Sequence, residues 1–231
     1  MTYCGEHSLV NAYRDGAVAV SLRCRSWLCD DCYERRRNQL IAEAIAGKPN
    51  TFLTLTIRRS RARSPEHAVA LLADAWRKLR RKIAAEHNGK LAPFLLIVER
   101  HLSGWPHFHI LCRMPYIDQS LLSAWMQEIL DSPILWIERL RSQRGAAKYA
   151  AKYCGKCTQK IGTKKRYWKS RDYPLEPGQA GLPALEVNGP WFIDQRSLQD
   201  IVNVWQRSGL IVEWLGPNKA LSSRPPAHGP P

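Results

Sequence analysis

The chain has 231 residues, of which 45% are hydrophobic, so it can bury the core of one sizeable domain with an appendage. Its 35 Lys and Arg residues against 20 Asp and Glu give a formal net charge of +15, which favours a polyanionic partner such as nucleic acid over a merely basic surface. No stretch approaches the roughly 20 apolar residues of a membrane span. No basic start leads into an apolar run, so neither a membrane partner nor a signal peptide is expected.

A group of cysteines marks the beginning of the chain. Cys24, Cys29 and Cys32 have the tight spacing of a zinc knuckle, and Cys4 completes a tetrahedral set of thiolates, with His7 as the alternate fourth ligand. Cysteines crowded in this way indicate metal binding in a reducing compartment rather than a disulfide framework. The sequence therefore predicts a structural Zn²⁺ site, which stands against the simpler interpretation of reduced, unliganded cysteines.

The middle of the chain alternates predicted strands and helices. Thr alternates with bulky apolar residues over 52–57, an apolar run fills 94–98, and amphipathic patterns run from Pro65 to about His87 and onward from Asp118. The full set of predicted elements after the cysteines is a basic helix at 33–46, a strand at 52–57, a helix at 65–87, strands at 94–99 and 107–113, a helix after 118, a strand at 134–140 and a helix at 142–155. This βαββαβ order predicts an α+β fold with a ferredoxin-like, RRM-like antiparallel sheet and helices on one face.

Two histidines lie side by side on one predicted strand. Alternate residues of a strand share a face, so His107 and His109 point the same way and offer half of a metal site, unless they are simply surface or packed histidines. If strands 94–99 and 107–113 form a hairpin, Glu99 lies near them and adds an oxygen ligand. Whether Glu99 shares their face depends on a one-residue choice of register. Two or three protein ligands leave open positions for a catalytic Mg²⁺ or Mn²⁺.

Two tyrosines occupy one face of the following helix. Tyr149 and Tyr153 are four residues apart, and a tyrosine hydroxyl is a competent nucleophile at phosphorus. Lys152 and Lys156 each follow a tyrosine by three residues, and each can lower the tyrosine pKa or hold a phosphate. Tyrosines at this spacing are usually core residues. The histidine strand and the basic composition favour the catalytic interpretation instead.

Basic and aromatic residues alternate over 156–171, which suits contacts to the backbone and bases of single-stranded DNA, although a cationic loop has the same composition. Residues 172–190 are predicted to form a linker, 194–208 a helix and 210–214 a terminal strand. The predicted organisation is a zinc knuckle with its basic helix at 1–47, a core at 48–157, a basic loop, linker and helix–strand at 158–215, and a disordered Pro-rich tail at 216–231. The predicted DNA-binding residues are Lys160, Lys164, Lys165, Arg166, Trp168 and Lys169.

Three motifs follow one another along the predicted core. Residues 52–57 (Phe-Leu-Thr-Leu-Thr-Ile), 106–110 (Pro-His-Phe-His-Ile) and 149–153 (Tyr-Ala-Ala-Lys-Tyr) resemble the motifs of the HUH endonucleases, the rolling-circle replication initiators of small single-stranded DNA phages and plasmids. The last motif resembles the two-tyrosine type, whereas Tyr153 with Lys156 also fits the single-tyrosine form. The resemblance covers roughly residues 51–157.

The resemblance implies an enzyme that nicks single-stranded origin DNA. A tyrosine attacks a phosphodiester, leaving a 5′-phosphotyrosine and a free 3′-OH for rolling-circle replication, and the strand is later rejoined. Metal ligands would be His107, His109 and Glu99, with Tyr149 and Tyr153 as nucleophiles. No Walker A motif is present, so a host helicase and polymerase, in a bacterial cytoplasm, are the implied partners. The alternatives are a transposase or relaxase of the same superfamily and a zinc-containing DNA-binding regulator without catalysis.

Overall fold

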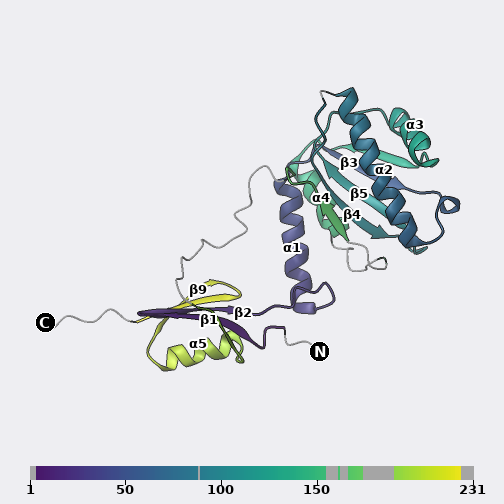
Figure 1. The fold of residues 1–231 in the computed structure, drawn as a ribbon. Helices are drawn as coiled ribbons and strands as arrows, with labels where there is room; N and C mark the ends of the chain where they lie inside the picture. The colour runs from purple at the N-terminus through teal and green to yellow at the C-terminus, as the bar shows by residue number, and fades with distance from the viewer. Residues whose placement is uncertain (1–3, 88, 155–160, 162–165, 174–189, 225–231) are drawn as a thin grey trace. The chain divides into compact units, whose positions relative to one another are not determined.

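The computed structural model describes residues 4–87, 89–154, 161, 166–173 and 190–224 (Figure 1). Within these ranges the chain forms five α-helices and two five-stranded antiparallel sheets, which confirms the predicted α+β class. The chain divides into two compact units, one made of residues 1–36 and 179–231 and the other of residues 37–178. None of the described helices is both long enough and apolar enough to cross a membrane.

The second unit contains the predicted ferredoxin-like sheet. Its strands have the order β6-β3-β5-β4-β7, and all neighbouring pairs are antiparallel. Helices α2 and α3 are the two helices of the βαββαβ repeat, and their apolar residues share one core with the sheet. The bounds are β3 Thr51–Thr56, α2 Pro65–Glu86, β4 Phe94–Arg100, β5 Pro106–Cys112, α3 Gln119–Leu130, β6 Leu135–Arg139, α4 Gln143–Cys154 and β7 Tyr167–Lys169.

Local sequence signals explain where α2 begins and which side it buries. The Ser64 hydroxyl accepts a hydrogen bond from the His67 backbone N–H at 3.2 Å, and Pro65 occupies the first helical position, where its missing N–H costs nothing. The apolar stripe of α2 is buried against the sheet, with Leu72 and Leu79 fully enclosed. The predicted amphipathic helix is therefore confirmed.

Alternation along β3 gives the sheet two different faces. Leu53 and Leu55 are fully buried in the core beneath α2 and α3. Phe52, Thr54 and Thr56 point to the opposite face. Helix α4 packs on that opposite face, and the predicted hairpin of β4 and β5 brings the histidine strand beside β3. The second face is therefore the one that carries the chemically active side chains.

A buried clasp fixes the end of helix α1 (Asp30–Ala46) within the second unit. Tyr173 is fully buried, and its hydroxyl donates a hydrogen bond to the Ala44 carbonyl at 2.8 Å. The Arg113 guanidinium binds the carbonyls of Gly47, of Tyr173 at 2.5 Å and of Asp172 at 2.6 Å. These bonds satisfy backbone acceptors at a helix end, which otherwise has no intrahelical partners there.

We expect Gly47→Ala to destabilise the protein, because a Cβ at Gly47 would lie 2.2 Å from the Tyr173 ring. Overpacking of this kind costs about 1–3 kcal/mol of unfolding free energy, measurable by denaturant titration. Gly145→Ala is the matched control, since its nearest neighbour is the Ser142 hydroxyl at 3.6 Å and alanine favours a helix. Equal stability of Gly47→Ala and the wild type would contradict the clasp.

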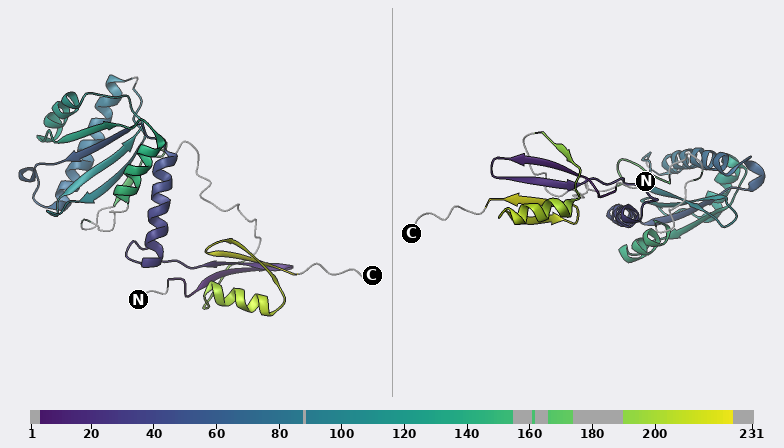
Figure 2. Two further views of the ribbon diagram at one scale, coloured as in Figure 1. Left: turned by 180° about the vertical axis from the view of Figure 1, so that it is seen from behind. Right: turned by 90° about the horizontal axis from the view of Figure 1, so that it is seen from below.

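The first unit joins segments from both parts of its chain into one sheet, with the order β8-β1-β2-β10-β9. Helix α5 lies along one face of this sheet (Figure 2), where Ile201 and Val202 pack against Ala19 and Ala220. The bounds are β1 Ser8–Tyr13, β2 Gly16–Ser21, β8 Phe192–Asp194, α5 Leu198–Arg207, β9 Ile211–Gly216 and β10 Lys219–Ser223.

Strand β10 lies within residues 216–231, the stretch that composition predicts to be a disordered tail. It is ordered because Ala220 and Ser222 are buried between β2 and β9, and because the Ser222 hydroxyl accepts a hydrogen bond from the Ala17 backbone N–H at 3.0 Å. The expected terminal strand at 210–214 is β9, which forms a hairpin with β10. Residues 225–231, and residues 174–189 of the predicted linker, lie outside the described residues.

Candidate functional site

The two histidines of β5 and Glu99 of β4 lie on the open face of the second sheet. Glu99 pairs across the hairpin with His107, so it shares their face, and its carboxylate lies 2.5 Å from the His109 Nε2 atom. A tight turn makes this hairpin, since the His101 backbone N–H donates to the Trp105 carbonyl at 2.9 Å and Gly104 adopts a φ of +84°. Imidazole and carboxylate together form a donor set that suits a divalent ion.

Two threonines of β3 hold the two histidines. The Thr54 hydroxyl lies 3.2 Å from the Nδ1 atom of His109, and the Thr56 hydroxyl lies 2.9 Å from the Nδ1 atom of His107. Each pair is directly opposite in the β3–β5 register. With Nδ1 engaged, Nε2 is left on each ring as the atom that can bind a metal ion.

The environment of His107 keeps its imidazole neutral. Burial lowers the pKa of His107, and the positive charge that His109 and His101 can carry lowers it further, against an opposing effect of Glu99. The rings of His101 and His107 lie 5.1 Å apart, so His101 also borders the site. Neutral imidazole is the form that binds a metal ion.

Helix α4 places its two tyrosines over the same face. The Tyr153 ring stacks on the His109 ring with the centroids 3.7 Å apart, and the Tyr149 ring stacks on Phe52 at 4.4 Å. The Ser142 hydroxyl accepts a hydrogen bond from the Gly145 backbone N–H at 3.1 Å in the first turn of α4, as predicted for a capping residue. The Lys152 ammonium lies 5.1 Å from the Tyr153 ring centroid. The structure thus brings Tyr153, His109 and Glu99 together.

The two tyrosine hydroxyls differ in their surroundings. The Tyr149 hydroxyl donates a hydrogen bond to the Glu138 carboxylate of β6. That hydrogen bond, together with burial and the negative charge of Glu138, raises the pKa of Tyr149 to about 12. Tyr149 therefore holds its proton more firmly than an ordinary tyrosine, which weakens it as a nucleophile.

The four predicted zinc ligands of the first unit gather in one place. The Sγ atoms of Cys4, Cys24, Cys29 and Cys32 all lie within 4.8 Å of one another, and those of Cys4 and Cys32 are 3.3 Å apart. Thiolates around a tetrahedral zinc ion are about 3.8 Å apart, so this set can bind a metal such as zinc. Within the described ranges it is the only cluster of three or more such ligands, and it contains neither His7 nor the histidines of β5.

The cysteine cluster already favours a thiolate. Burial acts to raise the pKa of Cys4, but hydrogen bonds from the Cys24 backbone and from the neighbouring thiols outweigh it and lower this pKa to about 7. Burial and the hydrogen bond to Cys4 raise the pKa of Cys32 to about 12. A metal ion bound here would displace the remaining protons, because thiolates are the ligands.

The predicted DNA-binding residues fall into two groups. Lys160, Lys164 and Lys165, like the predicted catalytic Lys156, lie outside the described residues. Arg166 is buried, and Trp168 packs on Phe108 at 5.7 Å at the edge of the core. The Lys169 ammonium lies 2.6 Å from the Glu43 carboxylate. The described members of this set are thus engaged within the second unit, where β7 pairs with β4.

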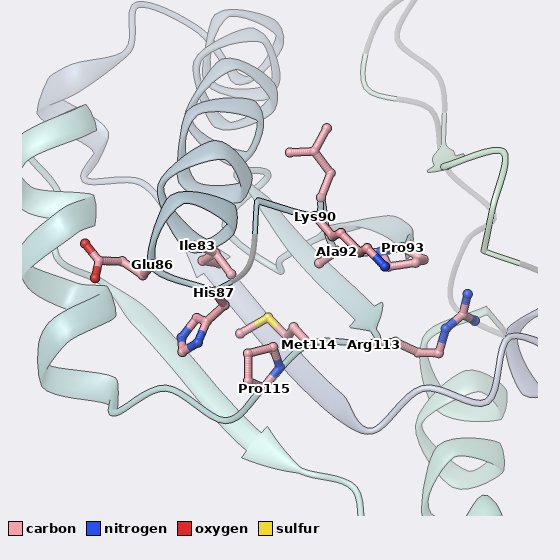
Figure 3. A pocket seen from close by; sticks show the side chains of 10 residues that line it. Ile83, Glu86, His87, Lys90, Ala92, Pro93, Arg113, Met114 and Pro115 are labelled. Carbon is pink, nitrogen blue, oxygen red and sulfur yellow. The ribbon is translucent and has the colours of Figure 1, made fainter.

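Figure 3 shows a pocket of about 560 Å³ at the end of α2. It is lined by His87, Lys90 and Pro93, which precede β4, and by Met114 and Pro115, which follow β5. The histidines and Glu99 lie toward the other ends of these strands. The guanidinium of Arg113 is committed to backbone carbonyls of the clasp. This pocket therefore contributes nothing to the histidine–tyrosine site.

Several residues of the site are not predictable from the sequence. The pattern over 52–57 places Thr54 and Thr56 on one face of a strand, but only the β3–β5 register shows that they contact the histidines. Glu138 stands two residues after an exposed tryptophan on a short strand, and no local pattern connects it with Tyr149. His101 is predicted only as part of a turn. Such contacts follow from strand pairing, which local sequence does not encode.

The comparisons with known proteins agree with this arrangement. A family model described as replication-associated protein ORF2 matches residues 50–158. The matched residues include the β3 strand, the two histidines and both tyrosines. No curated protein and no solved structure matches the chain significantly. The match supports a replication-related function and, with it, binding to DNA.

Proposed function

We propose that this chain is a rolling-circle replication initiator of the HUH type, which nicks single-stranded DNA through a tyrosine nucleophile. The stacking of Tyr153 on His109, at 3.7 Å between ring centroids, is the observation that carries the proposal, because it joins the candidate nucleophile to the candidate metal ligand. The match to a replication-associated family supports the same conclusion.

In the proposed reaction the Tyr153 hydroxyl attacks a phosphodiester phosphorus and loses its proton. The bond from phosphorus to the 3′ oxygen breaks, that oxygen takes up a proton, and the 5′ phosphate stays on the tyrosine. The exposed Lys152 ammonium beside the Tyr153 ring favours the phenolate. Rejoining is the reverse step, with a 3′-OH as the nucleophile.

A divalent ion would be held by His107, His109 and Glu99. The close approach of Glu99 to His109, and the threonines that direct both Nε2 atoms, are the features that fit it. When bound, Mg²⁺ or Mn²⁺ would polarise the phosphate and neutralise charge as it develops. The protein residues supply orientation, since the β3–β5 pairing fixes both rings.

The experiment is a search for covalent adducts. A random-sequence single-stranded library labelled at its 3′ end is incubated with the protein and Mn²⁺, and the products are separated on a denaturing gel. We expect labelled protein from the wild type and none from the Tyr149→Phe/Tyr153→Phe double variant. Binding to the library without any adduct would overturn the proposal and leave a zinc-containing DNA-binding protein. Sequencing the trapped DNA would identify the preferred site.

We further expect Thr54→Val and Thr56→Val each to weaken Mn²⁺ binding about 10- to 100-fold, because valine keeps the shape of threonine and removes the hydrogen bond to Nδ1. Titration of Mn²⁺ by electron paramagnetic resonance measures this without any nicking. Thr54→Ser and Thr56→Ser are the matched controls, since serine retains the hydroxyl and should retain most of the affinity. Unchanged affinity in both valine variants would rule out the orienting role.

A further inference from the structure

A large apolar side chain stands exposed on the face that carries the site. Trp136 lies in β6, at the edge of the second sheet, and 56% of its surface is accessible. Its neighbours Leu135 and Ile137 point to the other face and are buried in the core. The exposure of Trp136 is therefore a consequence of its position on the open face and not of a poorly packed strand.

Strand register places Trp136 in line with the histidine site. Thr54 is directly opposite Trp136 on one side and directly opposite His109 on the other. Paired strands are about 4.8 Å apart, so Trp136 and His109 are separated by about 10 Å across one row of the sheet. Two residues further along β6, on the same face, Glu138 holds the Tyr149 hydroxyl.

The surroundings of this edge are basic and hollowed. A pocket of about 660 Å³ is lined by Glu138 and Tyr149 together with Tyr116, Arg139 and Arg141. Both arginines are exposed, and Tyr116 is 49% exposed. A guanidinium binds phosphate oxygens in a bidentate manner, and aromatic faces stack on bases of any sequence. The chemistry of the β6 edge thus matches one polymer, single-stranded nucleic acid.

We propose that Trp136 is a base-stacking platform, on which a nucleotide next to the attacked phosphate stacks while Arg139 and Arg141 contact the adjoining backbone. The proposal rests on the proposed function for the identity of the strand as DNA. It adds a subsite beside Tyr149, about two strands from His109. A stacked base here would hold the strand across the row of Thr54 and His109.

The test is equilibrium binding of a fluorescein-labelled 20-mer of deoxythymidine, without added divalent ion. We expect Trp136→Ala to bind about five- to a hundredfold more weakly than the wild type, and Trp136→Phe to recover most of the loss, because phenylalanine also stacks. Leu121→Ala is the matched control, since Leu121 is 45% exposed on α3, which covers the other face of the sheet. Affinity for a duplex of the same length should be equal in all four proteins, since paired bases cannot stack on the platform.

Equal affinity of Trp136→Ala and the wild type for the 20-mer would overturn the subsite, whether or not adducts form. So would a loss of duplex binding by the same factor, or a loss of self-association on size-exclusion chromatography, which would make Trp136 a contact between copies at the sheet edge. A wild type that binds the 20-mer through Trp136 and forms no adduct would sustain the subsite and refute nicking. The two proposals therefore fail separately.

Discussion

Tyr153→Phe should reduce the rate of adduct formation about a thousandfold or more, to the uncatalysed level, because it removes the nucleophile itself. Tyr149→Phe should change the first cleavage by less than about tenfold, the usual effect of one hydrogen bond. The difference follows from their surroundings, since Tyr149 donates to Glu138 and has a pKa raised to about 12. The measurement is single-turnover cleavage of a trapped site, followed on denaturing gels.

Both variants keep the aromatic ring, so each retains its stacking on Phe52 or His109 and should fold normally. This makes them controls for each other. If Tyr149→Phe lost all first-strand cleavage while Tyr153→Phe retained it, the assignment of the nucleophile would be reversed. If neither single variant lost it, the two hydroxyls would be interchangeable.

Loss of the cysteine cluster should have the largest effect on the first unit. We expect the wild type to contain one equivalent of zinc and Cys32→Ala to contain none, because the four Sγ atoms lie within 4.8 Å of one another. Structural zinc contributes an apparent 10–16 kcal/mol, which is comparable to the whole stability of a domain at about 5–15 kcal/mol. Elemental analysis gives the metal content, and limited proteolysis shows whether residues around the cluster open.

Cys112→Ala is the matched control for this change. Cys112 is fully buried in the second unit, so its replacement removes a thiol and leaves a small cavity without touching the cluster. We expect it to retain the zinc and to lose modest stability. A Cys32→Ala protein with full zinc content, or a wild type that holds no zinc, would contradict the structural role of the cluster.

The second unit is close to what its sequence predicts. The alternation of Thr with apolar residues over 52–57, the stripe of α2 and the hairpin of β4 and β5 are all local patterns, and they are sufficient for the ferredoxin-like order. The sequence leaves the face of Glu99 open, because a slip of one residue reverses every side chain of a strand. Only the observed pairing of Glu99 with His107 resolves it.

The first unit shows why other parts are not predictable. Its sheet pairs strands from distant segments, and nothing near β1 indicates that β8 will lie beside it. The strand β10 is hidden in the sequence because Gly216 and the prolines that follow residue 224 have the composition of a tail. Pairing with β2 gives these residues their structure, which is a tertiary effect that outweighs local propensity.

The discontinuous sheet also constrains how this protein can be made. The Ala17 backbone N–H and the Ser222 hydroxyl that it binds are 205 residues apart, and the whole second unit is synthesised between them. During translation the second unit can fold as it leaves the ribosome, whereas β2 must wait for β10 with its edge unpaired. Because an unpaired edge is a site of aggregation, the order of synthesis makes β1 and β2 the segment most in need of a chaperone.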